Sequence, residues 1–204
     1  LNLSTPINMK KGYIVLIVIA VLILGIFLWF KGSYNGMVQM SENVSEQWSN
    51  VENQYQRRLD LIPNLVNTVK GYAAHEQKTL TDVVNARAKA TQTQISFDNL
   101  NEATMKKLNQ TQGELSSALS RLMAISESYP DLKANQNFLE LQAQLEGTEN
   151  RIAVERRKFN EMVRSYNAYI RKFPKNIVAG MFGFVPKPYF EANSGAENAP
   201  KVEF

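Results

Sequence analysis

The chain has 204 residues, no cysteine, and a formal net charge of +4 from 23 basic and 19 acidic side chains. Without cysteine it can form no disulfide, thiolate metal site or lipidated cysteine, and it has no cysteine nucleophile. Basic pairs such as Lys106–Lys107 and Arg156–Arg157 lie among acidic residues, which indicates solvated helix surface and argues against nucleic-acid binding.

The first predicted element is an unbroken apolar run from Tyr13 to Phe30, flanked by Lys10, Lys11 and Lys31. At ~1.5 Å per residue the run is about long enough to cross the ~30 Å hydrocarbon core, where backbone groups must pair internally. It therefore predicts a transmembrane helix after a short N-terminal segment, residues 1–12, in which Met9 resembles a natural start. A cleaved signal peptide is the alternative, but its apolar core is usually ~7–15 residues long.

The charges beside this run favour a short N-terminus inside the cell. Lys10 and Lys11 precede the run, whereas Lys31 follows it together with Glu42 and Glu46. Basic flanks prefer the cytoplasmic side of a membrane. We therefore expect a single-pass protein whose soluble domain lies outside the cytoplasm.

Residues 34–184 are predicted to form a bundle of long helices. Apolar residues recur from Met37 to Tyr72 at the three-, four- and seven-residue spacing of a coiled-coil seam, which predicts a helix over about 34–90 with a kink at Pro63. A second helix begins after Asp98, and a third begins at Asp131 or Asn135 and stops at Pro174. Short connections make neighbouring helices antiparallel. The fold class is therefore all-α, with one N-terminal transmembrane helix followed by an antiparallel up-and-down bundle of the four-helix type.

A short apolar segment interrupted by glycines follows the third helix. Its bulky residues are a candidate docking patch for a partner, with docking on the bundle itself or on the bilayer as alternatives. The patch consists of Ile177, Val178, Met181, Phe182 and Phe184. Prolines and small polar residues predict that residues 185–204 form a flexible tail.

The most unusual polar residues precede the mid-helix proline. Arg57 and Asp60 have the i, i+3 spacing of a surface pair. Arg58 falls near the apolar seam, where it would need a carboxylate, and Glu146 and Glu149 of the third helix are the candidates. The five residues form either a buried ion-pair network or, as the functional alternative, a ligand site.

No motif argues for catalysis or for a metal. The single histidine, His75, is followed by Glu76, but Thr79 stands where a His-Glu-x-x-His zinc motif needs its second histidine. The segment Gly180–Gly183 lacks the Lys-Ser/Thr of a phosphate-binding loop, and no serine has a histidine nearby in sequence. We therefore expect no enzymatic activity, no cofactor and no metal.

Several long segments, in the same order from Tyr34 onward, resemble the LemA family of bacterial membrane proteins. They are Gln56–Val66, Val69–Glu76, Tyr129–Ala134, Glu146–Ile152, Phe159-Asn160 with Tyr166-Asn167, and Pro200–Phe204. The resemblance implies one N-terminal transmembrane helix, a soluble helical bundle and no established enzymatic activity. It also implies a short N-terminus outside the cell, opposite to what the lysine flanks favour.

These observations predict a membrane-anchored helical scaffold or adaptor in the bacterial cytoplasmic membrane. Its expected partners are the lipid bilayer, through residues Tyr13 to Phe30, and unidentified membrane or envelope proteins. Two alternatives stay open. One is a ligand- or metal-binding sensor or enzyme centred on the segment of Arg57, Arg58 and Asp60 together with His75 and Glu149, and the other is a homo-oligomer acting on the membrane.

Overall fold

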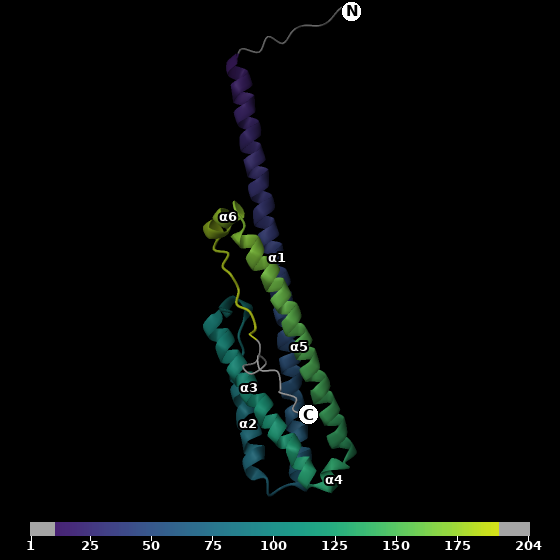
Figure 1. The fold of residues 1–204 in the computed structure, drawn as a ribbon. Coiled ribbons are helices and arrows are strands. Elements are labelled where there is room, and N and C mark those ends of the chain that lie inside the picture. The colour runs from purple at the N-terminus through teal and green to yellow at the C-terminus, as the bar shows by residue number, and fades with distance from the viewer. Residues whose placement is uncertain (1–10, 192–204) are drawn as a thin grey trace, which may run out of the picture.

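A computed structural model describes residues 11–191, and every regular element within that range is helical (Figure 1). The long helices are α1 (Lys11–Tyr72), α2 (Gln77–Gln92), α3 (Glu102–Ala124) and α5 (Gln136–Arg171). The short ones are η1 (Phe97–Asn99), η2 (Ile125–Ser128), α4 (Pro130–Lys133) and α6 (Lys175–Phe182). The all-α prediction is confirmed. The predicted N-terminal segment up to residue 10 and the predicted tail from residue 192 lie outside the described residues.

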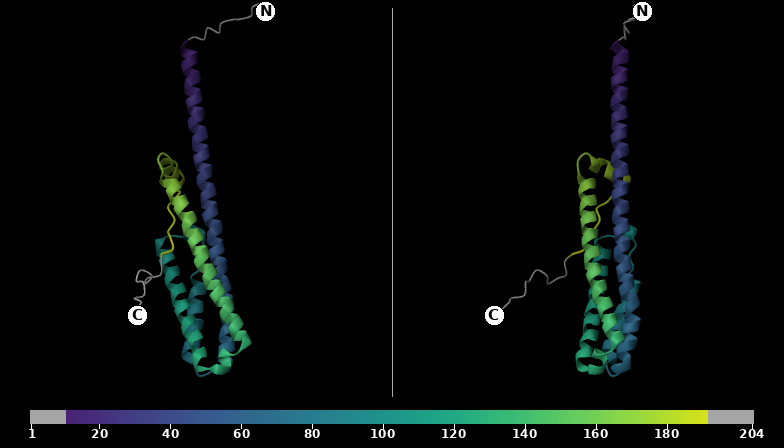
Figure 2. Two further views of the ribbon diagram at one scale, coloured as in Figure 1. Left: turned by 45° about the vertical axis from the view of Figure 1, so that its right-hand side comes forward. Right: turned by 90° about the vertical axis from the view of Figure 1, so that its right-hand side faces the viewer.

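The helices alternate in direction, so the predicted antiparallel up-and-down bundle is also confirmed. α1 packs along α5 and α2 packs along α3, and the two pairs lie side by side (Figures 1 and 2). We call the end at Tyr72 and α4 the distal end, and the end at Phe30 and α6 the proximal end. α2 and α3 flank only the distal part of the long α1–α5 pair, and the apolar start of α1 projects alone from the proximal end.

The projecting part of α1 is the predicted membrane anchor. Its large apolar side chains from Tyr13 to Trp29 are 41% to 65% exposed, and an 18-residue window within it has a mean hydropathy of 3.1. Such a helix is long and apolar enough to cross a membrane. The protein is therefore membrane-anchored, with its bundle on one side of the anchor.

α1 runs without interruption from the apolar run into the bundle, which differs from the predicted helix over 34–90 with a kink at Pro63. The helix continues through Pro63 to Tyr72, and the chain reverses at residues 73–76. Pro63 is exposed, so its ring displaces no core residue. Proline deprives the carbonyl of Leu59 of its usual intrahelical donor, and the Nε of Arg87 on α2 donates to that oxygen at 3.0 Å instead. A side chain of the neighbouring helix α2 therefore replaces the missing backbone donor.

Asparagine side chains cap the N-termini of α3 and α5. The predicted cap Asp98 lies within η1, and α3 begins instead after Asn101, whose side chain accepts from the backbone N–H of Thr104 at 3.1 Å. The Thr104 hydroxyl accepts in turn from the N–H of Asn101, completing a capping box. Asn135, one of the two predicted alternatives, caps α5 by accepting from the N–H of Phe138.

The interior divides into two hydrophobic cores along the bundle. The proximal core joins α1, α5, α6 and the start of α3, and its members include Met37, Trp48, Tyr55, Phe159 and Tyr166. The distal core joins α1, α2, α3, α4 and α5, and its members include Leu59, Ile62, Leu65, Leu115, Leu122 and Phe138. On α1 the boundary falls between Tyr55 and Leu59, which places Arg58 at the junction.

Residues 184–191 fold back along the proximal part of the bundle, and we call them the C-terminal strap. Phe190 is buried in the proximal core, where its ring stacks on Trp48 at 5.9 Å and meets Phe159 edge-on at 5.4 Å. The predicted flexible tail from residue 185 is therefore packed as far as Phe190, because an aromatic side chain anchors it.

Candidate functional site

A polar layer centred on Arg58 separates the two cores. The side chain is 2% exposed, and its guanidinium donates hydrogen bonds to Glu149 on α5 and to Gln112 and Ser116 on α3. The distance to the Ser116 hydroxyl is 2.9 Å, and the guanidinium carbon lies 5.7 Å from the centre of the Tyr55 ring. One side chain of α1 thus reaches two other helices at the level where apolar packing is interrupted.

The other residues of the predicted network do not join this layer. Arg57 and Asp60 lie on the exposed side of α1, and Asp60 accepts from Gln56 at 2.7 Å instead of pairing with Arg57. Glu146 is exposed and accepts from Gln142. Successive helix residues turn by about 100°, so of the three charged residues of the predicted network on α1 only Arg58 shares the buried face of Tyr55 and Ile62. His75, part of the sensor alternative, is exposed at the distal turn.

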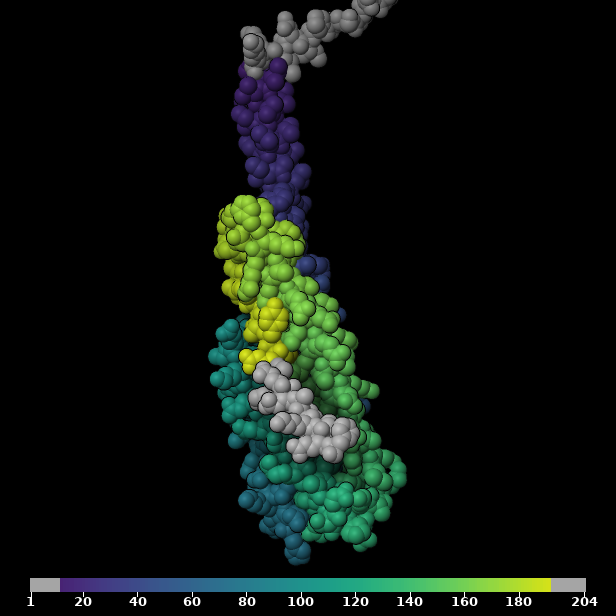
Figure 3. All heavy atoms as spheres, viewed as in Figure 1, coloured from purple at the N-terminus to yellow at the C-terminus, as the bar shows by residue number. Residues whose placement is uncertain are grey.

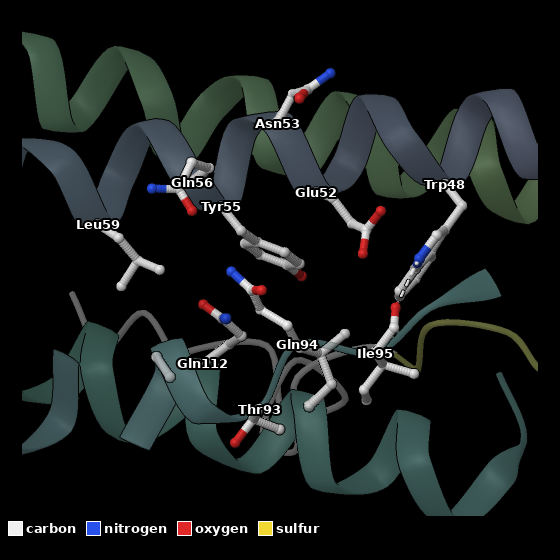
Figure 4. A pocket seen from close by; sticks show the side chains of 12 residues that line it. Trp48, Glu52, Asn53, Tyr55, Gln56, Leu59, Thr93, Gln94, Ile95 and Gln112 are labelled. Carbon is white, nitrogen blue, oxygen red and sulfur yellow. Dashed lines mark hydrogen bonds between the residues drawn. The ribbon is translucent and has the colours of Figure 1, made fainter. Parts of the chain in front are cut away.

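A cavity of about 300 Å³ lies beside the polar layer, between α1, α3 and the segment that follows α2 (Figure 4). Figure 4 shows the Tyr55 hydroxyl and the Glu52 carboxylate directed into the space that Gln94 and Gln112 also approach. At the other end the Trp48 indole donates to the carbonyl of Ile95 at 3.0 Å. The cavity is thus lined by hydrogen-bonding groups on one side and by an aromatic wall at one end.

Burial changes the acidity of two groups in this cavity. It raises the pKa of Tyr55 above its ordinary value, and it raises the pKa of the Glu52 carboxyl. The Tyr55 hydroxyl and the Nε of Arg58 have no hydrogen-bond partner among the described residues. Within residues 11–191 no three His, Asp or Glu side chains gather as metal ligands. The arrangement can accept and donate hydrogen bonds.

The structure also assigns a role to two asparagines for which sequence reasoning found none. Asn167 donates to the carbonyl of Lys187 and accepts from its N–H, both at 2.9 Å. Asn160 makes the same pair of bonds to Phe190, at 2.9 and 2.8 Å. Seven helical residues rise ~10 Å, which matches three extended ones. The seven-residue spacing of Asn160 and Asn167 on a buried helix face was the feature of the sequence that could have indicated their pairing with an extended segment.

The predicted docking patch at the proximal end is divided by the fold. Val178 is buried, and the Phe182 ring meets Phe30 at 5.6 Å and Tyr34 at 4.8 Å. Phe184 also packs on Tyr34. Ile177 and Met181 remain 55% and 67% exposed. Part of the segment therefore docks on α1, while part of it faces outward.

Comparison with known proteins finds a matching family model and several similar bacterial proteins. The model of the LemA family matches residues 47–204. Magnetosome protein MamQ 2 of Paramagnetospirillum magneticum is 30% identical over 207 residues, covering 92% of this chain and 76% of the relative. Magnetosome protein MamQ of Magnetospirillum gryphiswaldense is 29% identical with the same coverage. Protein LemA of Metamycoplasma hominis is 24% identical over 189 residues, covering 92% of this chain and 82% of that protein.

Proposed function

Because the chain belongs to the LemA family, we propose that it is a membrane-anchored helical scaffold that binds other proteins of the bacterial envelope without catalysis of its own. We further propose that residues Tyr13 to Phe30 cross the cytoplasmic membrane with the N-terminus inside. The bundle then stands outside the cytoplasm.

The observation that carries this proposal is the continuity of α1. A 62-residue helix is about 93 Å long, and the part from Lys31 to Tyr72 accounts for about 60 Å of it. No loop lies between the anchor and the bundle, so the distal end is held at a fixed distance from the bilayer. A rigid post of this length suits a protein that presents a surface to partners well away from the lipid.

The polar layer supports the same proposal. Buried polar groups that must find their partners favour one helix register over its neighbours. Arg58 engages α3 and α5 together, so sliding either helix by one turn would separate it from a partner. A fixed register keeps the exposed faces of the distal bundle in one arrangement, as a binding scaffold requires.

Site-specific crosslinking in intact cells tests the proposal. A photoreactive amino acid replaces Val84 on α2 or Leu139 on α5, which are 50% and 43% exposed on the distal part of the bundle. We expect discrete adducts with envelope proteins, which should also co-purify in stoichiometric amounts from mildly solubilised membranes. The same probe at Leu22, within the anchor, serves as the control. Adducts with a second copy of the chain alone, or no adducts at the distal positions, would contradict the scaffold and favour self-association or another role.

The cavity favours a second candidate, the binding of a small neutral polar molecule. The observation behind it is the buried Tyr55 hydroxyl, which is directed into the cavity and has no partner among the described residues. Native mass spectrometry of the full chain released from micelles would detect a bound molecule as added mass. We expect that mass to decrease in Tyr55→Phe and to stay in Tyr34→Phe, whose hydroxyl is far from the cavity. Equal spectra for both variants would remove this candidate.

A further inference from the structure

The proximal end of the bundle carries an apolar surface beside the membrane anchor. In α6, Val178 and Ala179 are buried against the bundle, while Ile177 and Met181, one turn apart, are 55% and 67% exposed. Phe173, in the turn before α6, is 81% exposed. Ile177 and Met181 form an outward apolar face on a helix whose opposite face is docked, and Phe173 adds an exposed apolar side chain in the preceding turn.

The packing of α6 fixes its height relative to the anchor. Phe182 contacts both Phe30, the last residue of the apolar run, and Tyr34. Tyr34 lies about 6 Å farther along α1 than Phe30. The polar layer on each side of a bilayer is roughly 5–7 Å thick, so α6 lies within the headgroup region if the apolar run fills the hydrocarbon core.

The orientation of α6 fits the same position. The right-hand view of Figure 2 shows α6 crossing from the end of α5 to α1, and Figure 3 shows it as a shoulder where α1 leaves the bundle. A helix that crosses a membrane-spanning helix at the headgroup level lies along the membrane surface. Helices of that kind bury one apolar face at the boundary of headgroups and acyl chains.

Basic side chains predominate in the segment that ends α5 and forms α6 and the strap. Residues 162–190 contain Arg164, Arg171, Lys172, Lys175 and Lys187 but no aspartate or glutamate. Lys31 adds a sixth positive charge next to the apolar run. Arg171 and Lys172 are exposed, and Lys175 lies half-buried over the ring of Tyr169 at 3.5 Å. Basic side chains at the headgroup level attract anionic lipids.

We propose that α6 and the turn before it form a second membrane contact, in which Phe173, Ile177 and Met181 enter the interface and Arg171 and Lys172 bind anionic lipid headgroups. This inference rests on the membrane anchor and is independent of the proposed protein partners. A second contact beside the anchor prevents the bundle from tilting freely about a single helix. It also makes the orientation of the bundle depend on the lipid composition.

Fluorescence quenching by lipids tests the contact on the full chain. The chain has no cysteine, so Met181→Cys, Val84→Cys and Leu24→Cys each give one site for an environment-sensitive dye. The labelled proteins are placed in vesicles of phosphatidylcholine and phosphatidylglycerol that carry a quencher at headgroup depth or at acyl depth. We expect the dye at 181 to be quenched by the headgroup quencher, the dye at 24 by the acyl quencher, and the dye at 84 by neither.

Quenching at position 181 tests the second contact, and quenching at position 24 tests the anchor. If position 24 is quenched and position 181 is as unaffected as position 84, the anchor stands and the second contact is wrong. Coverage of α6 by another copy of the chain would give that same unquenched signal at 181. Loss of quenching at position 24 would instead overturn the anchor itself.

The preference for anionic lipid has its own test. Arg171→Gln combined with Lys172→Gln removes two exposed positive charges at the proximal end. Lys106→Gln combined with Lys107→Gln removes the same charge from α3 and is the matched control. We expect phosphatidylglycerol to increase quenching at 181 several-fold in the parent and the control pair, and much less in the proximal pair. An equal increase in all three proteins would contradict a headgroup-binding role for Arg171 and Lys172.

Discussion

Arg58 illustrates how much one buried charge controls in this bundle. Its guanidinium is nearly inaccessible, whereas the side chain of its partner Glu149 is 43% exposed. Removal of the carboxylate therefore leaves a buried charge without its counterion, while removal of the arginine leaves a carboxylate that water can reach. The two members of the pair therefore differ in what their removal costs, and substitutions at the two positions should have unequal effects on stability.

We predict that Glu149→Leu lowers the free energy of unfolding by about 3 kcal/mol, because the buried guanidinium loses its charged partner. Adding Arg58→Met should recover most of that loss, since the double variant buries no unpaired charge. Thermal or denaturant unfolding of the full chain in micelles, followed by the fluorescence of buried Trp48, measures both values.

Glu146→Leu is the matched control for this prediction. Glu146 lies one turn before Glu149, is exposed, and accepts a hydrogen bond from Gln142 on its own helix. Its replacement should change the free energy of unfolding by less than about 0.5 kcal/mol. Equal losses for Glu146→Leu and Glu149→Leu would show that Arg58 draws no stability from its ion pair.

The contact between Arg87 and the carbonyl of Leu59 leads to a second prediction at this scale. Arg87→Met should cost about 1 kcal/mol in the parent chain, because it leaves a backbone oxygen without its donor. In a Pro63→Ala background the helix supplies that donor itself, so the same substitution should cost much less. A double-mutant cycle measured by unfolding in micelles gives the difference. Equal costs in the two backgrounds would mean that Arg87 does not compensate for the proline.

At the scale of elements, the apolar spacing predicted the helices but not where the first one ends. The seams around Leu115 and Ile152 are regular, so sequence alone locates α3 and α5 within a few residues. Pro63 misled the prediction because its cost is offset by Arg87, which lies 28 residues from Leu59 and contributes no local signal. Long-range compensation of this kind is not visible in spacing.

The polar layer shows the same limit. The position of Arg58 on the seam, together with the need for a carboxylate, singled out Glu149 as one of two candidates. Gln112 and Ser116 could not be anticipated, because an amide or hydroxyl in a helix is common on any face. The cavity beside Tyr55 depends on the path of residues 93–95 after α2, which no periodicity describes.

The C-terminal strap yields a prediction for a whole element. Asn167→Ala removes two hydrogen bonds to the backbone of Lys187, each worth about 1 kcal/mol. Local opening of the strap should then become roughly 30-fold more frequent. Chymotrypsin cleavage after Tyr189 or Phe190, followed by mass spectrometry of the full chain in micelles, measures that increase.

Asn150→Ala on the exposed surface of α5 is the control for the strap, since no hydrogen bond joins Asn150 to residues 184–191. It should leave the cleavage rate unchanged. If Asn167→Ala also leaves it unchanged, the burial of Phe190 and its hydrogen bonds with Asn160 retain the strap, and Phe190→Ala should then loosen it.

At the scale of the whole molecule, the membrane side of the bundle depends on which charges act during insertion. The orientation rule counts basic residues close in sequence to the ends of the span. Lys10 and Lys11 precede the run, and Lys31 is the only basic residue after it before Arg57. Arg171, Lys172 and Lys175 reach the same end only when the bundle folds, so they cannot influence insertion.

We therefore predict that a cysteine replacing His75, exposed at the distal turn, reacts with a membrane-impermeant maleimide in intact spheroplasts. Ser4→Cys, before the run, should react only after lysis. The reverse pattern would place the bundle in the cytoplasm and overturn the argument from the lysine flanks. The folded cluster at Arg171 and Lys172 would then face the anionic inner leaflet, so that lipid attraction after folding, not charge during insertion, would govern how the bundle rests on the membrane.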